Sequence, residues 1–492
     1  MKKIFSAQNI WLDATIITIE VDTNNSLPWI EIIWLPDNSI KESRERIKIA
    51  CKNSNITFTP KKYVVNLAPS NVKKFGSRFD LAIATWLVLM MSKNCKNQEI
   101  FLSNCLIFWE LWLDWTIKYI QWLLPTILSS KKQWWKNFII PYEAIDEVSF
   151  VQWVSFYALQ SFDEIISFIK SNNGFKKIWW WWVQQKFNNY KHNYLIKHSI
   201  YWHILAKKVM KIAVLWKHNV LLIWSPWTWK TLLAHYLWLL LPPLDYKESL
   251  EVTAIHSAWW KLPPSKMISK RPFIKAHSSI SYGWMFGWWT YLHPWLVSLA
   301  HRWVLFLDEM WEFKRDILEW LRQPMQDKKI MISRIHWSAV YPADCMVVAT
   351  MNPCRCWYYW DTQKQCICSS NEIKRYQAKI SWPLLDRFDI ILDVTRQPLS
   401  DELWQQEFVE DISQLYKWYA FINKHRQKMT VSKSCKDTVK LLSKKFTLSW
   451  RVVSNLLNLS SSIAWYNQIW SVKKEHILEA YQYRSMRMVI DL

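Results

Sequence analysis

The residues with the clearest chemical pattern lie between Leu221 and Thr231, where the chain reads Leu-Leu-Ile-Trp-Ser-Pro-Trp-Thr-Trp-Lys-Thr. The spacing is that of a phosphate-binding loop, G-x-x-x-x-G-K-[ST], with tryptophan at three positions that suit glycine. Such a loop brings backbone N–H groups against phosphate oxygens, some of them from residues with positive φ. Indole side chains there would fill the volume that a nucleotide needs. The loop therefore binds a nucleotide only if these tryptophans are glycine in the native protein.

The composition of the whole chain supports that substitution. The chain has 39 tryptophans and only 4 glycines in 492 residues, whereas an ordinary protein contains about 7% glycine. The simplest explanation is that the gene belongs to a lineage that reads the UGA codon as glycine, so that tryptophan is printed wherever UGA occurs. We therefore interpret most tryptophans as glycine. The protein made with UGA read as glycine is called the glycine form below.

The alternative is that the tryptophans are real and form an aromatic core or a stacking surface for nucleic acid. Their placement argues against it, because many stand beside proline, serine or aspartate, as turn glycines do. Examples are Trp29, Trp34, Trp224, Trp227, Trp229 and Trp382. The run from Trp179 to Trp182 would be a glycine-rich hinge. A few tryptophans are expected to be genuine, one of Trp134 and Trp135 among them.

With glycine restored, the loop predicts a site for ATP and Mg²⁺. Lys230 is expected to reach the β- and γ-phosphates, and Thr231 to hold Mg²⁺ through its hydroxyl. The residues predicted to bind the nucleotide and its metal are Trp224, Ser225, Pro226, Trp227, Thr228, Trp229, Lys230, Thr231 and Asp308. The alternative is a surface loop that contains Lys-Thr by chance.

An apolar run that ends in two acids supplies the second half of this site. Residues 304–307 read Val-Leu-Phe-Leu and are followed by Asp308 and Glu309. We expect Asp308 to order the Mg²⁺ shell and Glu309 to polarise the attacking water. Alone, two acids after a strand would be a solvated strand end, but downstream of a phosphate-binding loop they predict catalysis.

Three more polar residues are candidates for phosphoryl transfer. Asn352 follows another apolar strand and suits the orientation of water, although it also fits an Asn-Pro turn. Arg387, at a helix-to-strand junction, could reach the nucleotide of a neighbouring subunit and stabilise the developing charge. A surface interaction between Asp386 and Arg387 is the alternative. Arg451 could close a C-terminal lid onto the phosphates.

Four cysteines within fifteen residues predict a metal site. Cys354, Cys356, Cys366 and Cys368 form two C-x-C pairs, enough for a tetrahedral structural Zn²⁺ with no open position. Reduced cysteines without a metal are the alternative. The other five are expected to be buried apolar residues, namely Cys51, Cys95, Cys105, Cys345 and Cys435.

The charge balance favours an anionic partner. The formal net charge is +23, which suits nucleic acid or an acidic membrane surface. A basic insertion at 261–301 and a basic hairpin at 328–341 are candidates for gripping DNA, with solvated basic loops as the alternative. No apolar run is long enough for a membrane span or signal peptide, so we expect a cytoplasmic protein that is not bound to a membrane.

The length suggests about three domains. Apolar patterns predict an N-terminal α/β or α+β domain (1–170), a polar linker (171–197), an α/β P-loop core (198–397) and a helical lid (398–492). In the first domain, β-rich runs are expected at 16–21, 29–34, 63–67 and 99–108, and an amphipathic helix at 39–53. In the lid, helices are expected at 415–422, 439–446 and 452–463.

Together these motifs resemble the ComM/YifB family of magnesium-chelatase-like AAA+ ATPases, over nearly the full chain. The matching stretches are 34–37, 42–46, 65–69, 79–81, 109–115, 306–309, 321–324, 332–334, 352–354 and 383–387. The resemblance implies an N-terminal domain of the S5/Lon-protease-like fold, an AAA+ module with a helix-2 insertion, a helical lid and a homo-hexameric ring. Family members of the competence type are DNA helicases that drive branch migration in recombination and natural transformation.

The chain departs from the family at one site, and two other functions stay open. The family usually carries a His-His pair in the insertion, whereas this chain has Ala276-His277-Ser278. The stretch 76–80, where a Lon-type nucleophile would lie, shows no Ser–Lys pair, so no peptidase activity is expected. The alternatives to a DNA motor are a chelatase-like ATPase that remodels a protein partner and a nucleotide-gated scaffold without motor activity.

Overall fold

A computed structural model of the chain describes residues 3–484. The residues outside its description within that range are 26–28, 34–37, 55, 57–58, 71, 73, 75–76, 93–94, 119–121, 172–174, 176, 179–194, 199–203, 225–229, 260–266, 272, 282, 284, 286–295, 303, 334–337, 360–363, 395–407 and 425–431. The chain divides into two compact units. One comprises residues 1–191, 249–268 and 291–293, and the other comprises 192–248, 269–290 and 294–492.

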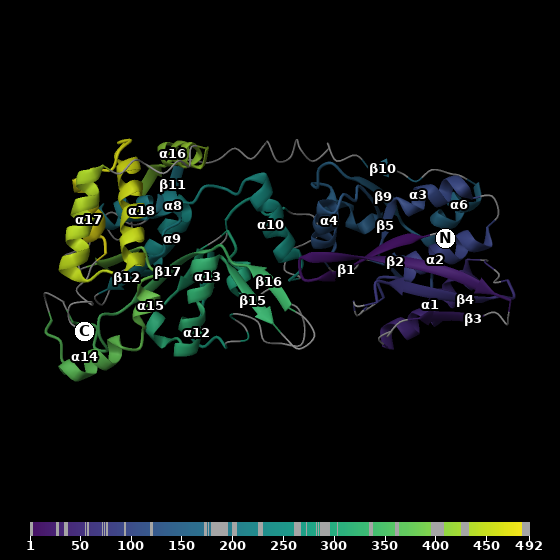
Figure 1. Ribbon diagram of the computed structural model, residues 1–492, viewed down its shortest axis with the longest axis horizontal. Coiled ribbons are helices and arrows are strands. Elements are labelled where there is room, and N and C mark those ends of the chain that lie inside the picture. The colour runs from purple at the N-terminus through teal and green to yellow at the C-terminus, as the bar shows by residue number, and fades with distance from the viewer. Residues whose placement is uncertain are drawn as a thin grey trace. The chain divides into compact units, whose positions relative to one another are not determined.

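The first unit is built on a mixed sheet with the order β10-β9-β8-β5-β1-β2-β4-β3 (Figure 1). Its strands are β1 (Ile4–Ile10), β2 (Asp13–Asn24), β3 (Trp29–Ile33), β4 (Lys62–Ala68), β5 (Cys105–Ile107), β8 (Asn137–Pro141), β9 (Ser155–Leu159) and β10 (Lys177–Ile178). A small hairpin joins β6 (Glu110–Leu111) and β7 (Ile117–Lys118). The alternating burial of β4 shows that one face of this strand packs on the core and the other does not.

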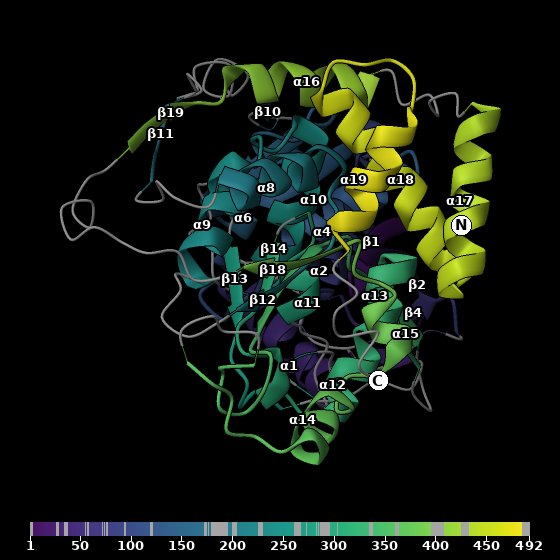
Figure 2. The ribbon, with the colours of Figure 1, turned by 90° about the vertical axis from the view of Figure 1, so that its left-hand side faces the viewer.

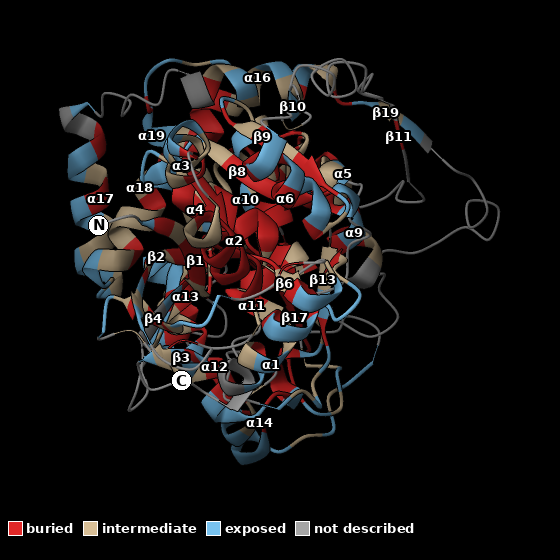
Figure 3. Cartoon of the chain, turned by 90° about the vertical axis from the view of Figure 1, so that its right-hand side faces the viewer, coloured by how far each residue is buried: buried red, intermediate tan, exposed pale blue. Residues whose placement is uncertain are grey.

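Helix α2 forms the centre of this unit's core. Every residue from Asp80 to Leu89 is buried, so this helix is apolar on all sides, as a fully enclosed helix must be. Figure 3 shows the buried residues in red along α2 and the strands beside it. The helices of the unit are α1 (Asn38–Asn53), α2 (Asp80–Met91), α3 (Lys96–Ser103), α4 (Leu123–Lys132), α5 (Ile145–Val148) and α6 (Phe162–Ser171), and α10 (Tyr246–Ser257) belongs to both units.

The second unit contains a five-stranded parallel sheet with the order β13-β14-β17-β12-β18. Its strands are β12 (Val220–Trp224), β13 (Phe273–Ala276), β14 (Val304–Leu307), β17 (Met346–Met351) and β18 (Ile390–Val394). β14 and β17 are buried along their whole length, as parallel strands covered on both faces are. Two antiparallel pairs accompany the sheet, β11 (Leu195–His198) with β19 (Phe408–Asp411), and β15 (Lys329–Ser333) with β16 (Ser338–Pro342).

Helices cover this sheet and extend into a C-terminal group. The first are α8 (Ile204–Trp216), α9 (Lys230–Leu240), α11 (Leu296–Leu299), α12 (Arg315–Trp320), α13 (Arg322–Asp327), α14 (Ser370–Gln377) and α15 (Trp382–Leu385). The C-terminal group is α16 (Ser413–Lys424), α17 (Lys433–Phe446), α18 (Trp450–Tyr466) and α19 (Lys474–Gln482), and Figure 2 shows α18 beside α19. Both groups contribute to one apolar core with the sheet. Among the described residues, no helix is long and apolar enough to cross a bilayer.

The structure confirms most of the expected elements and corrects one. The helix expected at 39–53 is α1, and the three C-terminal helices are α16, α17 and α18. The β-rich run expected at 99–108 is wrong in its first half, because residues 96–103 form helix α3 and only 105–107 form a strand. A short apolar run does not distinguish a strand from a helix by its period. The domain boundaries at 170, 197 and 397 stay predictions.

Backbone conformation supports the interpretation of tryptophan as glycine. Within the described part of the chain, the tryptophans with positive φ are Trp11, Trp115, Trp122, Trp134, Trp153 and Trp357, with φ between 58° and 76°. Bulky residues seldom adopt this conformation, whereas glycine does so at no steric cost. Trp134 is also 87% exposed, while Trp135 packs its ring 5.0 Å from that of Phe5. We therefore infer that Trp135 is the genuine tryptophan of this pair.

Buried indole groups also support the interpretation of tryptophan as glycine. Trp86, Trp216, Trp311 and Trp465 each bury an indole N–H that has no hydrogen-bond partner within the described residues. A buried donor without a partner costs about 1–3 kcal/mol, and native structures rarely leave one. Glycine at these positions removes that donor altogether.

Candidate nucleotide site

The residues predicted for ATP hydrolysis follow the carboxyl ends of neighbouring parallel strands. Asp308 and Glu309 follow β14, and Asn352 follows β17, with Leu307 paired to Ala349 in the register. The predicted phosphate-binding loop follows β12. This strand pairs with β17 on the side of β17 that faces away from β14. Because parallel strands end at the same edge, the sheet brings these segments together. This edge of an open α/β sheet is where such folds bind ligands.

The loop itself lies mostly outside the described residues. Residues 225–229 are among the gaps, the backbone of Trp224 ends β12, and Lys230 and Thr231 begin α9. Nothing is described of the side chains of Trp224, Lys230 and Thr231. Their roles toward ATP and Mg²⁺ stay predictions, supported by a strand that leads into a helix at the expected place.

Asp308 is held by residues from two other strands. Its Oδ1 accepts a hydrogen bond of 2.9 Å from the hydroxyl of Thr350, and its Oδ2 lies 2.8 Å from Nζ of Lys275. The same Thr350 hydroxyl accepts a bond of 3.1 Å from the backbone N–H of Glu309. Thr350 therefore fixes both acids at once. Sequence reasoning missed it, although a threonine within the apolar run 346–351 is the signal that could have identified it.

Glu309 adopts an unusual backbone conformation. Its φ of 51° and ψ of 58° lie in the left-handed region, which costs a glutamate about 1 kcal/mol or more. The short helical turn at Met310–Glu312 follows directly. Strained residues of this kind are concentrated at functional sites, which agrees with the predicted role of Glu309 toward water.

Arg387 lies at the amino ends of the parallel strands, opposite the carboxyl ends that carry the acids. Arg387 lies just before β18. Asp389, also before β18, accepts a hydrogen bond of 3.0 Å from the backbone N–H of Asn219, which lies just before β12. A five-residue strand spans about 15 Å, so Arg387 and Glu309 stand at the two ends of this sheet. Arg387 therefore does not reach the nucleotide edge of its own subunit.

Arg387 is one of three arginines gathered around Gln326. Its Nη2 donates to Oε1 of Gln326 at 2.8 Å, and Nη2 of Arg451 donates to the same oxygen, also at 2.8 Å. Its Nε donates to the carbonyl of Arg322 at 3.0 Å. Burial and the positive charges of Arg451 and Arg322 lower the pKa of Arg387. Arg322 and Arg387 border a cavity of about 370 Å³, and its full lining is Glu319, Trp320, Arg322, Gln323, Gln326, Asp327 and Arg387.

Asp386 makes its hydrogen bond to the C-terminal helices, and its negative charge partly offsets the lowering of the Arg387 pKa. Its Oδ2 accepts a bond of 2.9 Å from the hydroxyl of Ser449, the residue that caps α18. Its Oδ1 lies 3.7 Å from Arg484. Asp386 thus fixes the start of α18, which places Arg451 beside Arg387. The approach of Arg451 to the phosphates stays a prediction. The hydrogen bond from Arg451 to Gln326 lies beside Arg387, at the amino ends of the strands.

The four cysteines expected to bind a metal do come together. Their Sγ atoms all lie within 4.8 Å of one another, and the Sγ of Cys356 is 3.3 Å from those of Cys354 and Cys366. Sulfur atoms bound to one Zn²⁺ at 2.3 Å in a tetrahedron lie about 3.8 Å apart. Burial opposes a charge on Cys356, but N–H groups of Tyr358 and Ile367 and the neighbouring thiols lower its pKa to about 6. The cluster could hold a metal ion.

A backbone turn with a left-handed residue follows the first pair of cysteines. Trp357, directly after Cys356, has a φ of 76°, and the N–H of Tyr359 donates to Sγ of Cys354 at 3.4 Å. Glycine at position 357 would adopt this turn without strain. The hydrogen bond from the backbone would stabilise a thiolate at Cys354.

We expect the glycine form to contain about one zinc per chain, and the double variant Cys356→Ser, Cys366→Ser to contain none, because the loss of two thiolates leaves an incomplete tetrahedron. Removing zinc with a chelator should lower the melting temperature of the glycine form but not that of the double variant. Elemental analysis and thermal unfolding measure both effects. Cys435→Ser is the control, since Cys435 lies outside the cluster. Purified protein without stoichiometric zinc would contradict the expectation.

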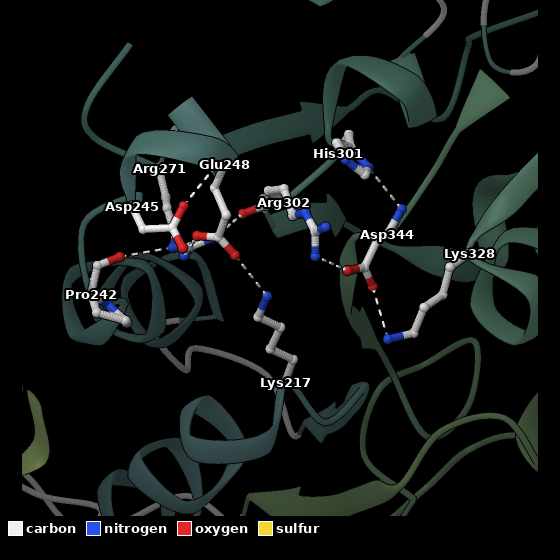
Figure 4. Close-up of polar contacts among 9 residues, drawn as sticks. All are labelled: Lys217, Pro242, Asp245, Glu248, Arg271, His301, Arg302, Lys328 and Asp344. Atoms are coloured by element: carbon white, nitrogen blue, oxygen red, sulfur yellow. Dashed lines mark hydrogen bonds and ion pairs between the residues drawn. The ribbon is translucent and has the colours of Figure 1, made fainter. Parts of the chain in front are cut away.

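An ion-pair network joins the amino ends of the strands (Figure 4). Glu248 pairs with Arg271 and, at 3.5 Å, with Lys217. Asp344 accepts from Arg302 at 2.7 Å, and Arg271 donates to the carbonyl of Arg302 at 2.7 Å. Lys328, which starts the β15–β16 hairpin, lies 3.1 Å from Asp344. Arg271 thus belongs to a buried network at the edge opposite the acids.

This network predicts a loss of stability in acid. Burial raises the pKa of Asp344, but the positive charges of Lys328, Lys217 and Arg302 lower it by more, so that this pKa lies below the ordinary value of an aspartate. A depressed folded-state pKa contributes stability that is complete above the unfolded value and is lost as the pH falls through the folded value. Asp344→Asn should therefore lower the free energy of unfolding at pH 7 by about 2 kcal/mol and flatten its decline below about pH 4.

Denaturant unfolding between pH 3 and 7 tests this prediction. The control is Asp437→Asn, because Asp437 is exposed on α17. Equal stability of Asp344→Asn and the parent at pH 7 would show that the network does not stabilise the fold.

Comparisons with known proteins agree with the fold and the site. A family model described as "Magnesium chelatase, subunit ChlI" matches residues 198–402, and one described as "Subunit ChlI of Mg-chelatase" matches residues 19–144. The chain is thus an AAA+ protein of the magnesium-chelatase type, a class of ATPases.

Individual similar proteins identify the family within this class more closely. The chain is 29% identical to "Competence protein ComM" of Haemophilus influenzae, over 98% of this chain and 97% of the relative. It is 29% identical to "Uncharacterized protein YifB" of Escherichia coli, over 98% and 96%. It is 32% identical to "Uncharacterized protein Rv2897c" of Mycobacterium tuberculosis, over 80% and 77%. The chain belongs to the ComM/YifB family of magnesium-chelatase-like AAA+ proteins.

Proposed function

We propose that the glycine form is an ATP-hydrolysing ring motor that acts on DNA, with ATP bound between subunits of a homo-hexamer. The main observation behind the proposed motor is that Arg387 lies at the amino ends of the strands, whereas Glu309 lies at their carboxyl ends. A subunit with this arrangement completes its phosphoryl-transfer site only with the arginine of a neighbour. A ring satisfies that requirement for every subunit.

In this proposal the roles follow the geometry of the described residues. Asp308 orders the Mg²⁺ shell, Glu309 polarises water, Asn352 orients it, and Arg387 stabilises charge on the neighbour's γ-phosphate. When bound, Mg²⁺ would neutralise charge on the phosphates. Thr350 keeps Asp308 and Glu309 in place through its hydroxyl. Gln326 orients Arg387 toward the subunit surface together with Arg451.

The net charge of +23 and the relative named as a competence protein support DNA as the substrate. A polycation is attracted to DNA phosphates regardless of sequence. The hairpin β15–β16 carries exposed Lys329 at its base, and Arg334 follows β15 in the sequence, outside the described residues. We propose that this hairpin contacts DNA, and that the activity is branch migration in recombination and natural transformation. The N-terminal unit would have the S5/Lon-protease-like fold.

Charge reversal in the hairpin tests the DNA proposal. The double variant Lys329→Glu, Arg334→Glu should reduce the ratio of ATP hydrolysis with DNA to that without DNA from several-fold to about one, because phosphate contacts dominate non-specific affinity. Hydrolysis is measured with and without single-stranded and forked DNA at two salt concentrations. Lys96→Glu, at an exposed position on α3, is the control. Unchanged stimulation would favour the chelatase-like alternative, in which the ATPase remodels a protein.

A further inference from the structure

Lys275 occupies a position beside the magnesium-ordering acid that the proposed reaction does not use. It lies on β13, which pairs with β14 so that Lys275 is opposite Phe306. Its ammonium lies 2.8 Å from Oδ2 of Asp308 and 5.7 Å from the centre of the Phe306 ring. The side chain of Lys275 is 46% exposed and that of Asp308 is 24% exposed. The ammonium is therefore partly solvated and free to exchange.

The two oxygens of Asp308 differ in how firmly their described partners are held. Oδ1 accepts from the Thr350 hydroxyl, which is buried and also bonded to the backbone of Glu309. That arrangement joins three groups, namely the Asp308 carboxylate, the Thr350 hydroxyl and the Glu309 backbone N–H. Oδ2 is paired with a lysine on a long flexible stem, which moves at little cost. An ammonium on this oxygen occupies an acceptor site that water in the shell of a metal ion could use, and its charge disfavours a second cation there.

We propose that Lys275 is a cation switch that occupies Asp308 when Mg²⁺ is absent and so raises the Mg²⁺ concentration needed to bind ATP. The inference rests on the proposed ATPase function. A unit positive charge within hydrogen-bonding distance of Asp308 neutralises the carboxylate and repels a divalent ion that approaches it. Both effects weaken the binding of Mg²⁺ at Asp308. Lys275 thereby links nucleotide binding to the supply of free Mg²⁺.

The test is binding of a fluorescent ATP analogue to the full-length glycine form while Mg²⁺ is titrated. Lys275→Met keeps the apolar stem and removes the charge, so it should lower the half-saturating Mg²⁺ concentration about threefold to tenfold, the effect expected for removing one partly solvated charge beside a divalent ion. Lys275→Arg keeps the charge and should stay within about twofold of the parent. Lys440→Met, at an exposed site on α17, should also match the parent.

The outcomes separate this inference from the proposed function. If the parent binds the analogue and Lys275→Met needs the same Mg²⁺ concentration as the parent, the switch is wrong and the ATPase proposal stands. If neither protein binds the analogue at any Mg²⁺ concentration, both are wrong. A lowered half-saturation in Lys440→Met as large as that in Lys275→Met would also overturn the switch, because it would reflect net charge alone.

Discussion

Placing glycine at positions 224, 227 and 229 is expected to turn a chain that does not bind ATP into one that does. The gain should be at least about 100-fold in affinity, because three indole rings no longer fill the phosphate-binding volume and the backbone N–H groups can approach the phosphates. The comparison is between the glycine form and the same protein with tryptophan at positions 224, 227 and 229 alone. Binding is measured by titration calorimetry with Mg²⁺ present.

Trp135→Gly is the control for this experiment. Its ring packs on Phe5, so the substitution should lower the free energy of unfolding by about 3 kcal/mol and leave nucleotide affinity unchanged. Peptide mass spectrometry of the protein from its own organism gives a second measurement, and we expect glycine at positions 224, 227 and 229. Tryptophan in those native peptides would leave no room for a triphosphate and would overturn the ATPase proposal.

The acids of the site could be predicted from sequence because their signal is local. A buried strand of four apolar residues followed by Asp308 and Glu309 is recognisable without any knowledge of the fold. That Asn352 joins them follows once both strands are placed in one parallel sheet. The cysteine cluster was likewise predictable, since all four thiols lie on one short stretch of chain and need no distant partner.

The partners of these residues could not be predicted because tertiary packing brings them together. Lys275 reaches Asp308 only through the register of β13 against β14, and no pattern around Lys275 marks it. Gln326 meets Arg387 and Arg451 from three segments that are far apart in sequence. The left-handed conformation of tryptophans such as Trp115 and Trp357 required backbone geometry, because turn-like neighbours alone do not reveal a left-handed residue.

The opposite positions of Glu309 and Arg387 predict that two inactive variants restore activity when mixed. Glu309→Gln and Arg387→Ala should each lower the ATP hydrolysis rate about 100-fold or more, the first by loss of the base toward water and the second by loss of the positive charge on the phosphate. In mixed rings of equal proportion, roughly a quarter of the interfaces combine an intact Glu309 with an intact Arg387. The mixture should therefore recover a substantial fraction of the parent rate, measured by phosphate release.

Two controls make this result specific. Glu312→Gln, at an exposed position after the site, should hydrolyse ATP at the parent rate. A mixture of Glu309→Gln with the double variant Glu309→Gln, Arg387→Ala should stay inactive, because no interface then has an intact Glu309. If Arg387 instead served the nucleotide of its own subunit, each chain in the first mixture would lack one group and mixing would restore nothing. Recovery in the first mixture alone thus requires that the arginine of one subunit complete the site of the next.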